Sequence, residues 1–277
     1  MSRIENTFAT LRANKKSALV PFVTAGDPNP EVTVPLMHAM VEAGASMIEL
    51  GVPFSDPMAD GPVIQRSSER ALKHHVSLNM VLEMVSEFRT KDIATPVVLM
   101  GYLNPIEVMG YENFAKKAAH AGVDGVLIVD LPPEEGEELT GLLKQQGVDP
   151  IYLLAPTTTE ARMDTICASA SGFVYYVSLK GVTGSSSLNV AQVAIKLSQI
   201  RKHTKLPVGV GFGIKNAATA ALVGVVADAV VIGSAIVNRM EELAETPEKI
   251  APEIAKLLKE IRVGMDDATQ RKSVNVS

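Results

Sequence analysis

Residues 47–65 read MIELGVPFSDPMADGPVIQ, and this stretch decides the fold because a strand, a loop and the start of a helix follow one another in it. The apolar run Met47–Val52 ends at a proline, and a loop with two further prolines leads into a helix-length segment. Near-continuous apolar character is typical of a strand covered on both faces, as in parallel sheets with helices outside. The stretch therefore predicts one strand–helix unit.

The same unit recurs along the whole chain. Glycines spaced 25 residues apart (Gly122, Gly147 and Gly172) precede three of the strands, as helix-terminating glycines would. A repeat of this length fits a closed barrel or a doubly wound sheet, and eight strands without a long linker or a composition break favour the barrel. The expected strands are Ala18–Thr24, Met47–Val52, Pro96–Met100, Gly125–Val129, Pro150–Leu154, Phe173–Val177, Pro207–Val210 and Ala229–Ile232.

We therefore expect an α/β fold, a (β/α)₈ TIM barrel, formed by residues 1–277 as a single domain. The length of 277 residues is within the usual range for this fold, at roughly 250 residues. An extra helix over Ile4–Asn14 precedes the first strand, a short extra helix follows the eighth, and a polar tail that frays is expected from about residue 266.

Composition excludes several function classes. The net charge of −5 with mixed signs and no basic block argues against nucleic acid, and a single cysteine excludes an internal disulfide. The apolar stretch Ala217–Val237 contains Asp228 and glycines, so a buried helix, turn and strand explain it better than a membrane span. No secretory signal is visible, and a cytoplasmic setting is expected.

Glu49 is the sharpest candidate for catalysis. Alternation along the strand places Ile48, Leu50 and Val52 against the helices and Glu49 toward the barrel interior. Burial raises the pKa of a carboxyl toward neutrality, which suits general acid–base work. A structural ion pair near the strand end is the alternative.

Asp60 is a second carboxylate just beyond the same strand, in a loop that prolines make stiff. Because active sites of such barrels lie at the carboxyl ends of the strands, Asp60 is a candidate partner of Glu49. The competing interpretation is an N-cap, since Asp60-Gly61-Pro62 is also how a helix begins. Asp56 could likewise be only a turn residue.

Glycine turns follow the last three expected strands, at residues 181–184, 211–213 and 233–234. Glycine lets backbone N–H groups approach a phosphate closely, and the short helix from Ser234 would direct its positive end at an anion. Phosphate sites in this fold are often built there. The predicted phosphate-binding residues are Gly184, Gly213, Gly233 and Ser234.

Apolar and aromatic residues at or near strand ends could form a flat pocket, although ordinary core is the alternative for each. The five histidines lack metal-ligand spacing, so no metal site is expected, and no serine triad, P-loop or dinucleotide motif is present. The pocket candidates are Phe22, Met100, Tyr102, Leu127, Tyr175 and Phe212.

The segment Glu49–Pro62 resembles the signature of the tryptophan synthase alpha subunit family. The resemblance continues at residues 21–28, 101–105, 129–132, 181–184 and 211–214, and so covers nearly the whole chain. It implies a lyase that cleaves indole-3-glycerol phosphate to indole and glyceraldehyde 3-phosphate without a cofactor on this chain. Glu49 would be the acid–base catalyst, and Asp60 would bind the indole N–H. The apolar candidates would hold the indole ring, with Tyr175 near Glu49.

The resemblance also implies a partner. In this family a beta subunit carries pyridoxal phosphate and joins indole to serine, within an alpha-beta-beta-alpha heterotetramer. The loop with Asp56 would face the beta subunit, and a lid over residues 179–190 that includes Thr183 would close over substrate. Leu179 departs from the arginine of some family members, which leaves open how closure is held.

Three other functions stay open at this point. A related phosphate-binding isomerase would share the late glycine turns, but it would not explain the pairing of Glu49 with Asp60. A regulatory partner with little activity of its own, or a stand-alone lyase that releases free indole, would carry the same motifs.

Overall fold

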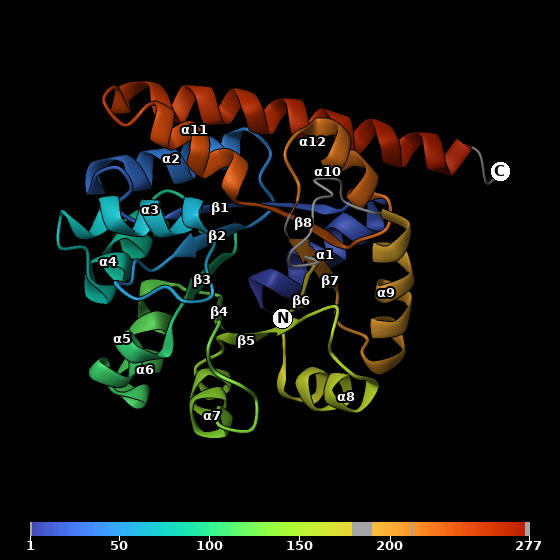
Figure 1. The fold of residues 1–277 in the computed structure, drawn as a ribbon, viewed down its shortest axis with the longest axis horizontal. Coiled ribbons are helices and arrows are strands. Elements are labelled where there is room, and N and C mark those ends of the chain that lie inside the picture. Colours follow the sequence, from blue (N-terminus) through green and yellow to red (C-terminus); the bar gives the residue numbers. More distant parts are fainter. Residues whose placement is uncertain (1, 179–189, 212, 275–277) are drawn as a thin grey trace.

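The computed structural model describes residues 2–178, 190–211 and 213–274 and forms a closed barrel (Figure 1). Eight parallel strands pair in chain order, and β8 pairs back with β1. The predicted (β/α)₈ fold and all eight predicted strands are confirmed. The strands are β1 (Ala18–Thr24), β2 (Ile48–Gly51), β3 (Val97–Gly101), β4 (Gly125–Ile128), β5 (Asp149–Leu154), β6 (Val174–Val177), β7 (Val208–Gly211) and β8 (Ala229–Ile232).

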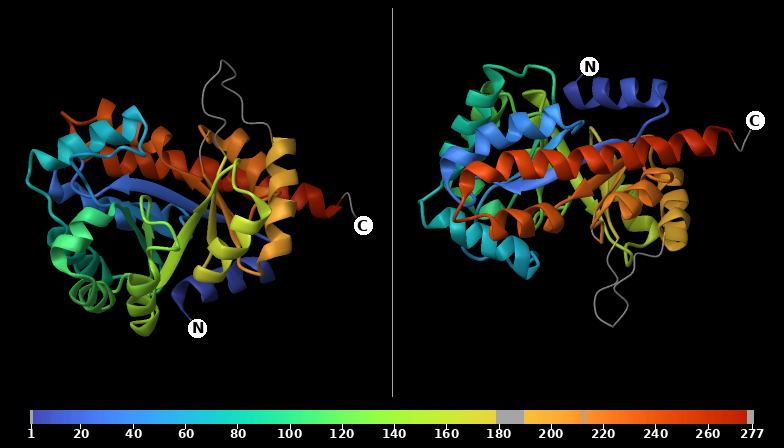
Figure 2. Two further views of the ribbon diagram at one scale, coloured as in Figure 1. Left: turned by 60° about the horizontal axis from the view of Figure 1, so that its bottom comes forward. Right: turned by 90° about the horizontal axis from the view of Figure 1, so that it is seen from above.

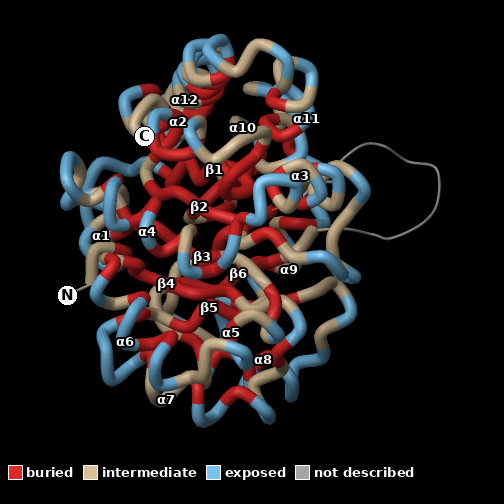
Figure 3. The backbone as a smooth tube through the Cα atoms, turned by 90° about the vertical axis from the view of Figure 1, so that its left-hand side faces the viewer, coloured by how far each residue is buried: buried red, intermediate tan, exposed pale blue. Residues whose placement is uncertain are grey.

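Helices surround the barrel, so the strands are buried while the helices carry the exposed surface (Figure 3). Some strands are followed by two helices. The helices that matter most for the site are α3, which follows β2, and α11, which follows β8. The helices are α1 (Arg3–Ala13), α2 (Pro30–Glu42), α3 (Pro62–Leu72), α4 (Leu78–Arg89), α5 (Leu103–Met109), α6 (Tyr111–Ala121), α7 (Glu137–Gln145), α8 (Glu160–Ser169), α9 (Val190–His203), α10 (Ala217–Gly224), α11 (Ser234–Glu242), the 3₁₀ turn η1 (Pro247–Lys249) and α12 (Ile250–Val274).

Two details at the level of single elements follow from the sequence patterns. Gly122, Gly147 and Gly172 all adopt positive φ, and Gly122 is the left-handed cap of α6, as the 25-residue repeat predicts. The apolar stretch 217–237 folds as α10, β8 and the start of α11. None of the helices in the described part of the chain is long and apolar enough to cross a membrane.

The end of the chain differs from the expected fraying tail. Helix α12 continues to Val274 and lies across α10 and α2 (Figures 1 and 2). Arg262 donates to Asp266 one turn later at 2.5 Å, and Met265 is fully buried against the core. The buried apolar stripe of α12 ends at Met265, and the helix continues beyond it into the polar segment.

The core has two layers. One lies between the strands and the helices and contains the outward-facing residues of β2, Ile48 and Leu50. The other fills the barrel interior, where Val98, Leu127 and Tyr175 meet. This division confirms that alternate residues of β2 face the helices.

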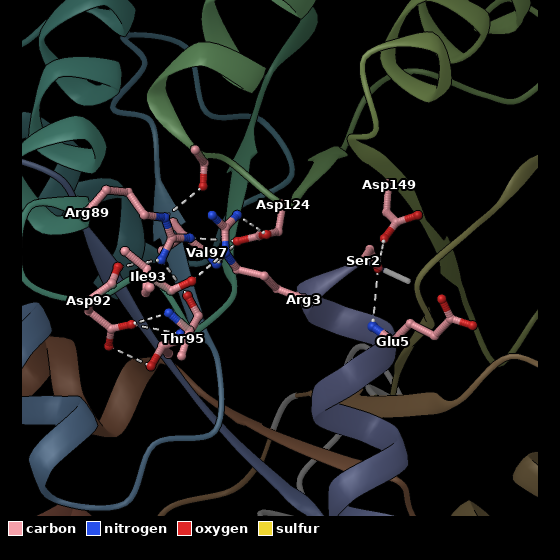
Figure 4. A network of polar contacts seen from close by, with 12 residues as sticks. Ser2, Arg3, Glu5, Arg89, Asp92, Ile93, Thr95, Val97, Asp124 and Asp149 are labelled. Atoms are coloured by element: carbon pink, nitrogen blue, oxygen red, sulfur yellow. Dashed lines mark hydrogen bonds and ion pairs between the residues drawn. The ribbon is translucent and has the colours of Figure 1, made fainter.

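Helix α1 covers the end of the barrel where the strands begin. Its Ile4 and Phe8 belong to the interior cluster. Arg3 on α1 and Arg89 on α4 both bind Asp124, just before β4, at 2.9 and 2.6 Å (Figure 4). Asp124 also accepts from the Val97 amide at 2.8 Å, so one buried carboxylate joins three elements. Since this end is covered, an active site is left to the opposite end.

Replacing Asp124 by alanine should destabilise the protein by about 3 kcal/mol, because the change leaves the Arg89 guanidinium, only 10% exposed, without its charge partner. The free energy of unfolding in urea measures the loss. Glu112→Ala is the control, since the Glu112–Lys116 pair is 71% and 60% exposed and should contribute only about 0.5 kcal/mol. Equal losses in the two variants would contradict the role given to Asp124.

Candidate active site

Glu49 lies on β2 inside the barrel with 3% of its surface exposed. It pairs in register with Phe22 on β1 and Val98 on β3. Burial raises the pKa of Glu49 to about 8, and the charge of nearby Asp60 adds to the shift. No described residue forms an ion pair with Glu49, so the described part of the chain offers no partner for a structural ion pair. A carboxyl that is neutral near pH 7 can donate a proton and take it back.

Asp60 lies in the loop between β2 and α3, and Tyr102 holds it. The Tyr102 hydroxyl donates to Asp60 Oδ2 at 3.0 Å and accepts from the Ala59 amide at the same distance. Gln65 donates to the Asp60 carbonyl at 2.9 Å. The N-cap of α3 is Gly61, so the interpretation of Asp60 as the cap is wrong, and its side chain is available for the site.

The two carboxyls have different environments. Burial raises the pKa of Asp60, but the hydrogen bond from Tyr102 opposes the shift by stabilising the ionised form. Glu49 has no such donor among the described residues, and burial acts on it almost alone. Two neighbouring carboxyls in such unlike environments are the arrangement in which one can carry a proton while the other is stabilised as a negative charge.

An apolar wall lies beside these groups. The Phe22 ring is so close to Gly51 that a Cβ there would be 2.7 Å from it, and the same ring faces Gly233 at 3.5 Å. Leu127 and Tyr175 are buried in the interior cluster, and Met100 packs against it. The Tyr175 hydroxyl occupies the space that a side chain at Gly211 would need. Five of the six apolar candidates are thus near strand ends or inside the barrel, and the sixth, Phe212, lies outside the described residues.

Features expected for an anion site follow β7 and β8. Gly233 is the N-cap of α11 and Ser234 is its first residue; the Ile236 and Val237 amides donate to the Gly233 carbonyl, whereas the amides of Ser234 and Ala235 precede any acceptor that the helix can offer. Gly213 adopts a φ of +77°. Gly184 and Thr183 lie outside the described residues. Assigning these positions to a phosphate stays a prediction, as does a partner contact for Asp56, which is exposed and accepts from Ser55.

Sequence reasoning missed two features of this end of the barrel. It placed Tyr102 in the apolar pocket without seeing that its hydroxyl holds Asp60, and it did not connect Asp27, Arg70 and Glu241. The position of Tyr102, directly after the strand next to β2, was the available signal. Within the described segments, no cluster of three His, Cys, Asp or Glu residues could hold a metal ion.

Comparison with known proteins decides the family. The family model for the tryptophan synthase alpha chain matches residues 8–267. The alpha chain of Thioalkalivibrio sulfidiphilus is 65% identical over 96% of this chain and 100% of its own length. That of Methylococcus capsulatus is 57% identical over the same shares. This chain belongs to the tryptophan synthase alpha chain family.

Solved structures agree with this family. The alpha subunit from Legionella pneumophila str. Paris is 46% identical with a TM-score of 0.88, over 96% of this chain and 99% of that one. A chain of Mycobacterium tuberculosis tryptophan synthase is 34% identical with a TM-score of 0.85, over 95% and 98%. Alpha chains of tryptophan synthase are lyases that cleave indole-3-glycerol phosphate. The family inferred from the Glu49–Pro62 segment is confirmed.

Tyr102→Phe should lower kcat/KM for indole-3-glycerol phosphate about tenfold, because Asp60 loses the donor that stabilises its ionised form. Indole release measures the effect. Tyr111→Phe is a matched control, since the Tyr111 hydroxyl on α6 donates to Glu107, an exposed residue on the neighbouring helix α5. An unchanged rate in Tyr102→Phe, or an equal fall in both variants, would contradict this role.

Proposed function

We propose that Glu49 and Asp60 carry the cleavage of indole-3-glycerol phosphate to indole and glyceraldehyde 3-phosphate in this chain. The observation that supports the proposal most is the pair of carboxyls in unlike environments, one buried with a pKa of about 8 and one held by Tyr102. Retro-aldol cleavage needs a proton delivered to carbon and another removed from a hydroxyl, and it needs no redox step.

The proton steps fit these two groups. Protonated Glu49 donates to C3 of the indole ring, which places a positive charge on the ring nitrogen. Ionised Asp60 accepts a hydrogen bond from the indole N–H and stabilises that charge. The Glu49 carboxylate then takes the proton of the hydroxyl next to the ring, the bond from C3 to the glycerol carbon breaks, and an aldehyde and indole form. Glu49 ends protonated, as it began.

The remaining parts of the site have supporting roles. Phe22, Met100, Leu127, Tyr175 and Phe212 would form the walls around the indole ring, and Tyr102 would hold Asp60 from its edge. The backbone at Gly184, Gly213, Gly233 and Ser234 would bind the phosphate, which the N-terminus of α11 favours electrostatically. A lid with Thr183 would exclude water.

Indole would pass to a beta subunit that carries pyridoxal phosphate, while this chain would need no cofactor. Support comes from the family and from the loop after β2, where Asp56 is exposed and Met58 is 85% exposed. An exposed apolar side chain beside the site suits contact with a partner. We place this partner in an alpha-beta-beta-alpha assembly.

The direct test is an assay of indole release by the purified chain, alone and with a beta subunit. Glu49→Gln should lower kcat by about 10³-fold, because the amide cannot transfer a proton, and Asp60→Asn by about 10²-fold, because the fixed charge is lost. Cleavage that survives both changes would contradict the proposed roles. A folded wild-type chain inactive under both conditions would leave a regulatory subunit.

Stability should depend on pH through Glu49. Its pKa is about 8 in the folded protein and 4.5 in its ordinary state, so the folded protein binds this proton more tightly than the unfolded chain. The resulting stabilisation is complete below pH 4.5 and is lost as the pH rises toward 8. Between pH 5 and 8.5 the wild type should lose about 4 kcal/mol more unfolding free energy than Glu49→Gln, which cannot ionise. Parallel pH curves would show that the pKa is not raised.

A further inference from the structure

Two arginines on α3 connect three elements around the site. Arg66 and Arg70 are one helical turn apart, and both donate to Glu241 on α11. Arg66 binds it with two bonds of 2.7 and 2.8 Å, and Arg70 adds a third of 3.0 Å from Nη1. Helices α3 and α11 lie side by side (Figure 3), and these charged contacts join them.

Arg70 also reaches a buried carboxylate beyond the end of β1. Its Nε donates to Asp27 Oδ1 at 2.6 Å and its Nη2 to Oδ2 at 2.9 Å. The Asp27 side chain is 0% exposed and that of Arg70 is 13% exposed. The planar guanidinium of Arg70 donates two parallel bonds to Asp27 and a third to Glu241, and so holds two carboxylates in one geometry. The ammonium group of a lysine cannot do this. Arg70 is therefore the residue in which β1, α3 and α11 meet.

The two helices that Arg70 joins begin next to the two groups proposed to bind the substrate. Helix α3 starts at Pro62, two residues after Asp60. Helix α11 starts at Ser234, next to the proposed phosphate position. A buried bond of 2.6 Å between Thr24 on β1 and Ser67 on α3 adds a second link to the barrel, but it does not involve α11. Arg66 and Arg70 both join α3 to α11 through Glu241, but of the two only Arg70 also binds the buried Asp27 after β1, so Arg70 ties both helices to the barrel.

We propose that Arg70 is a positioning residue that sets the distance between the Asp60 loop and the amino end of α11, so that one substrate engages both. The inference rests on the proposed function, because it takes indole and phosphate as the two groups bound. Each group contacts its own part of the ligand without Arg70. Only a ligand that spans both groups depends on their separation. A misplacement of about 1 Å can lower a reaction rate by as much as about 10²-fold.

The test compares three probes by calorimetry. Inorganic phosphate reports on one group, indole on the other, and indole-3-propanol phosphate, which cannot be cleaved, spans both. In Arg70→Gln we expect the Kd of the spanning probe to rise about tenfold, while the Kd values of phosphate and indole stay within about twofold. Arg70→Lys, which keeps the charge without the fork, should recover only part of the loss.

Two further variants keep the test decisive. Arg66→Gln removes only contacts of Arg66 with Glu241, so the spanning probe should bind within about twofold of wild type. Glu241→Gln weakens the contacts to α11 but keeps the buried Arg70–Asp27 pair, and it should weaken the spanning probe about threefold with the fragments unchanged. Should Arg70→Gln fail to fold, this second variant decides the question.

Two results would overturn the inference. A spanning probe that binds folded Arg70→Gln as tightly as wild type would remove the positioning role. A parallel loss for all three probes would reduce Arg70 to a general stabiliser of the fold. A wild-type chain that binds the spanning probe no more tightly than either fragment would instead overturn the proposed function, and this inference with it.

Discussion

The burial of the Glu49 carboxyl within an apolar barrel is the constraint on which the rest of the site depends. Water would lower the pKa of this group to its ordinary range, and a salt bridge would fix its charge. Glu49 is only 3% exposed and no described residue forms an ion pair with it, so burial raises the pKa of Glu49 to about 8. The apolar interior of the barrel can hold the protonated acid, because a neutral carboxyl loses much less solvation free energy on burial than a carboxylate does. The raised pKa of Glu49 thus results from ordinary core packing.

Asp60 differs from Glu49 in that a hydrogen-bond donor, the Tyr102 hydroxyl, contacts its carboxylate in the loop after β2. Prolines restrict the backbone of this loop, and the Tyr102 hydroxyl connects the Ala59 amide with the Asp60 carboxylate. Phe54 stacks on the Tyr102 ring at 5.1 Å and keeps the hydroxyl in place. Burial raises the pKa of Asp60, and the hydrogen bond from Tyr102 opposes that rise by stabilising the ionised form, whereas Glu49 has no such donor among the described residues.

The strands could be predicted from sequence because both of their faces are buried, which leaves apolar runs that are easy to recognise. The inward position of Glu49 followed from alternation alone. Asp60 could not be separated from a helix cap, because its role depends on Tyr102, which is 42 residues away and lies just after the next strand. The Arg70 contacts join residues 43 and 171 positions apart, and no local pattern encodes such pairs. The helical end of α12 also escaped prediction, because its composition is polar and its buried apolar stripe ends at Met265.

The substrate came from the resemblance of the Glu49–Pro62 segment, whereas the residues alone indicated only an acid–base glutamate and a phosphate site. The most direct test of the account is a ¹³C NMR titration of the Glu49 side-chain carboxyl in the full chain. The account predicts a midpoint near pH 8 that falls in Asp60→Asn, because the neighbouring negative charge is removed. A midpoint near the ordinary 4.5 in the folded protein would contradict it, since Glu49 would then be ionised at neutral pH and could not begin the reaction as an acid.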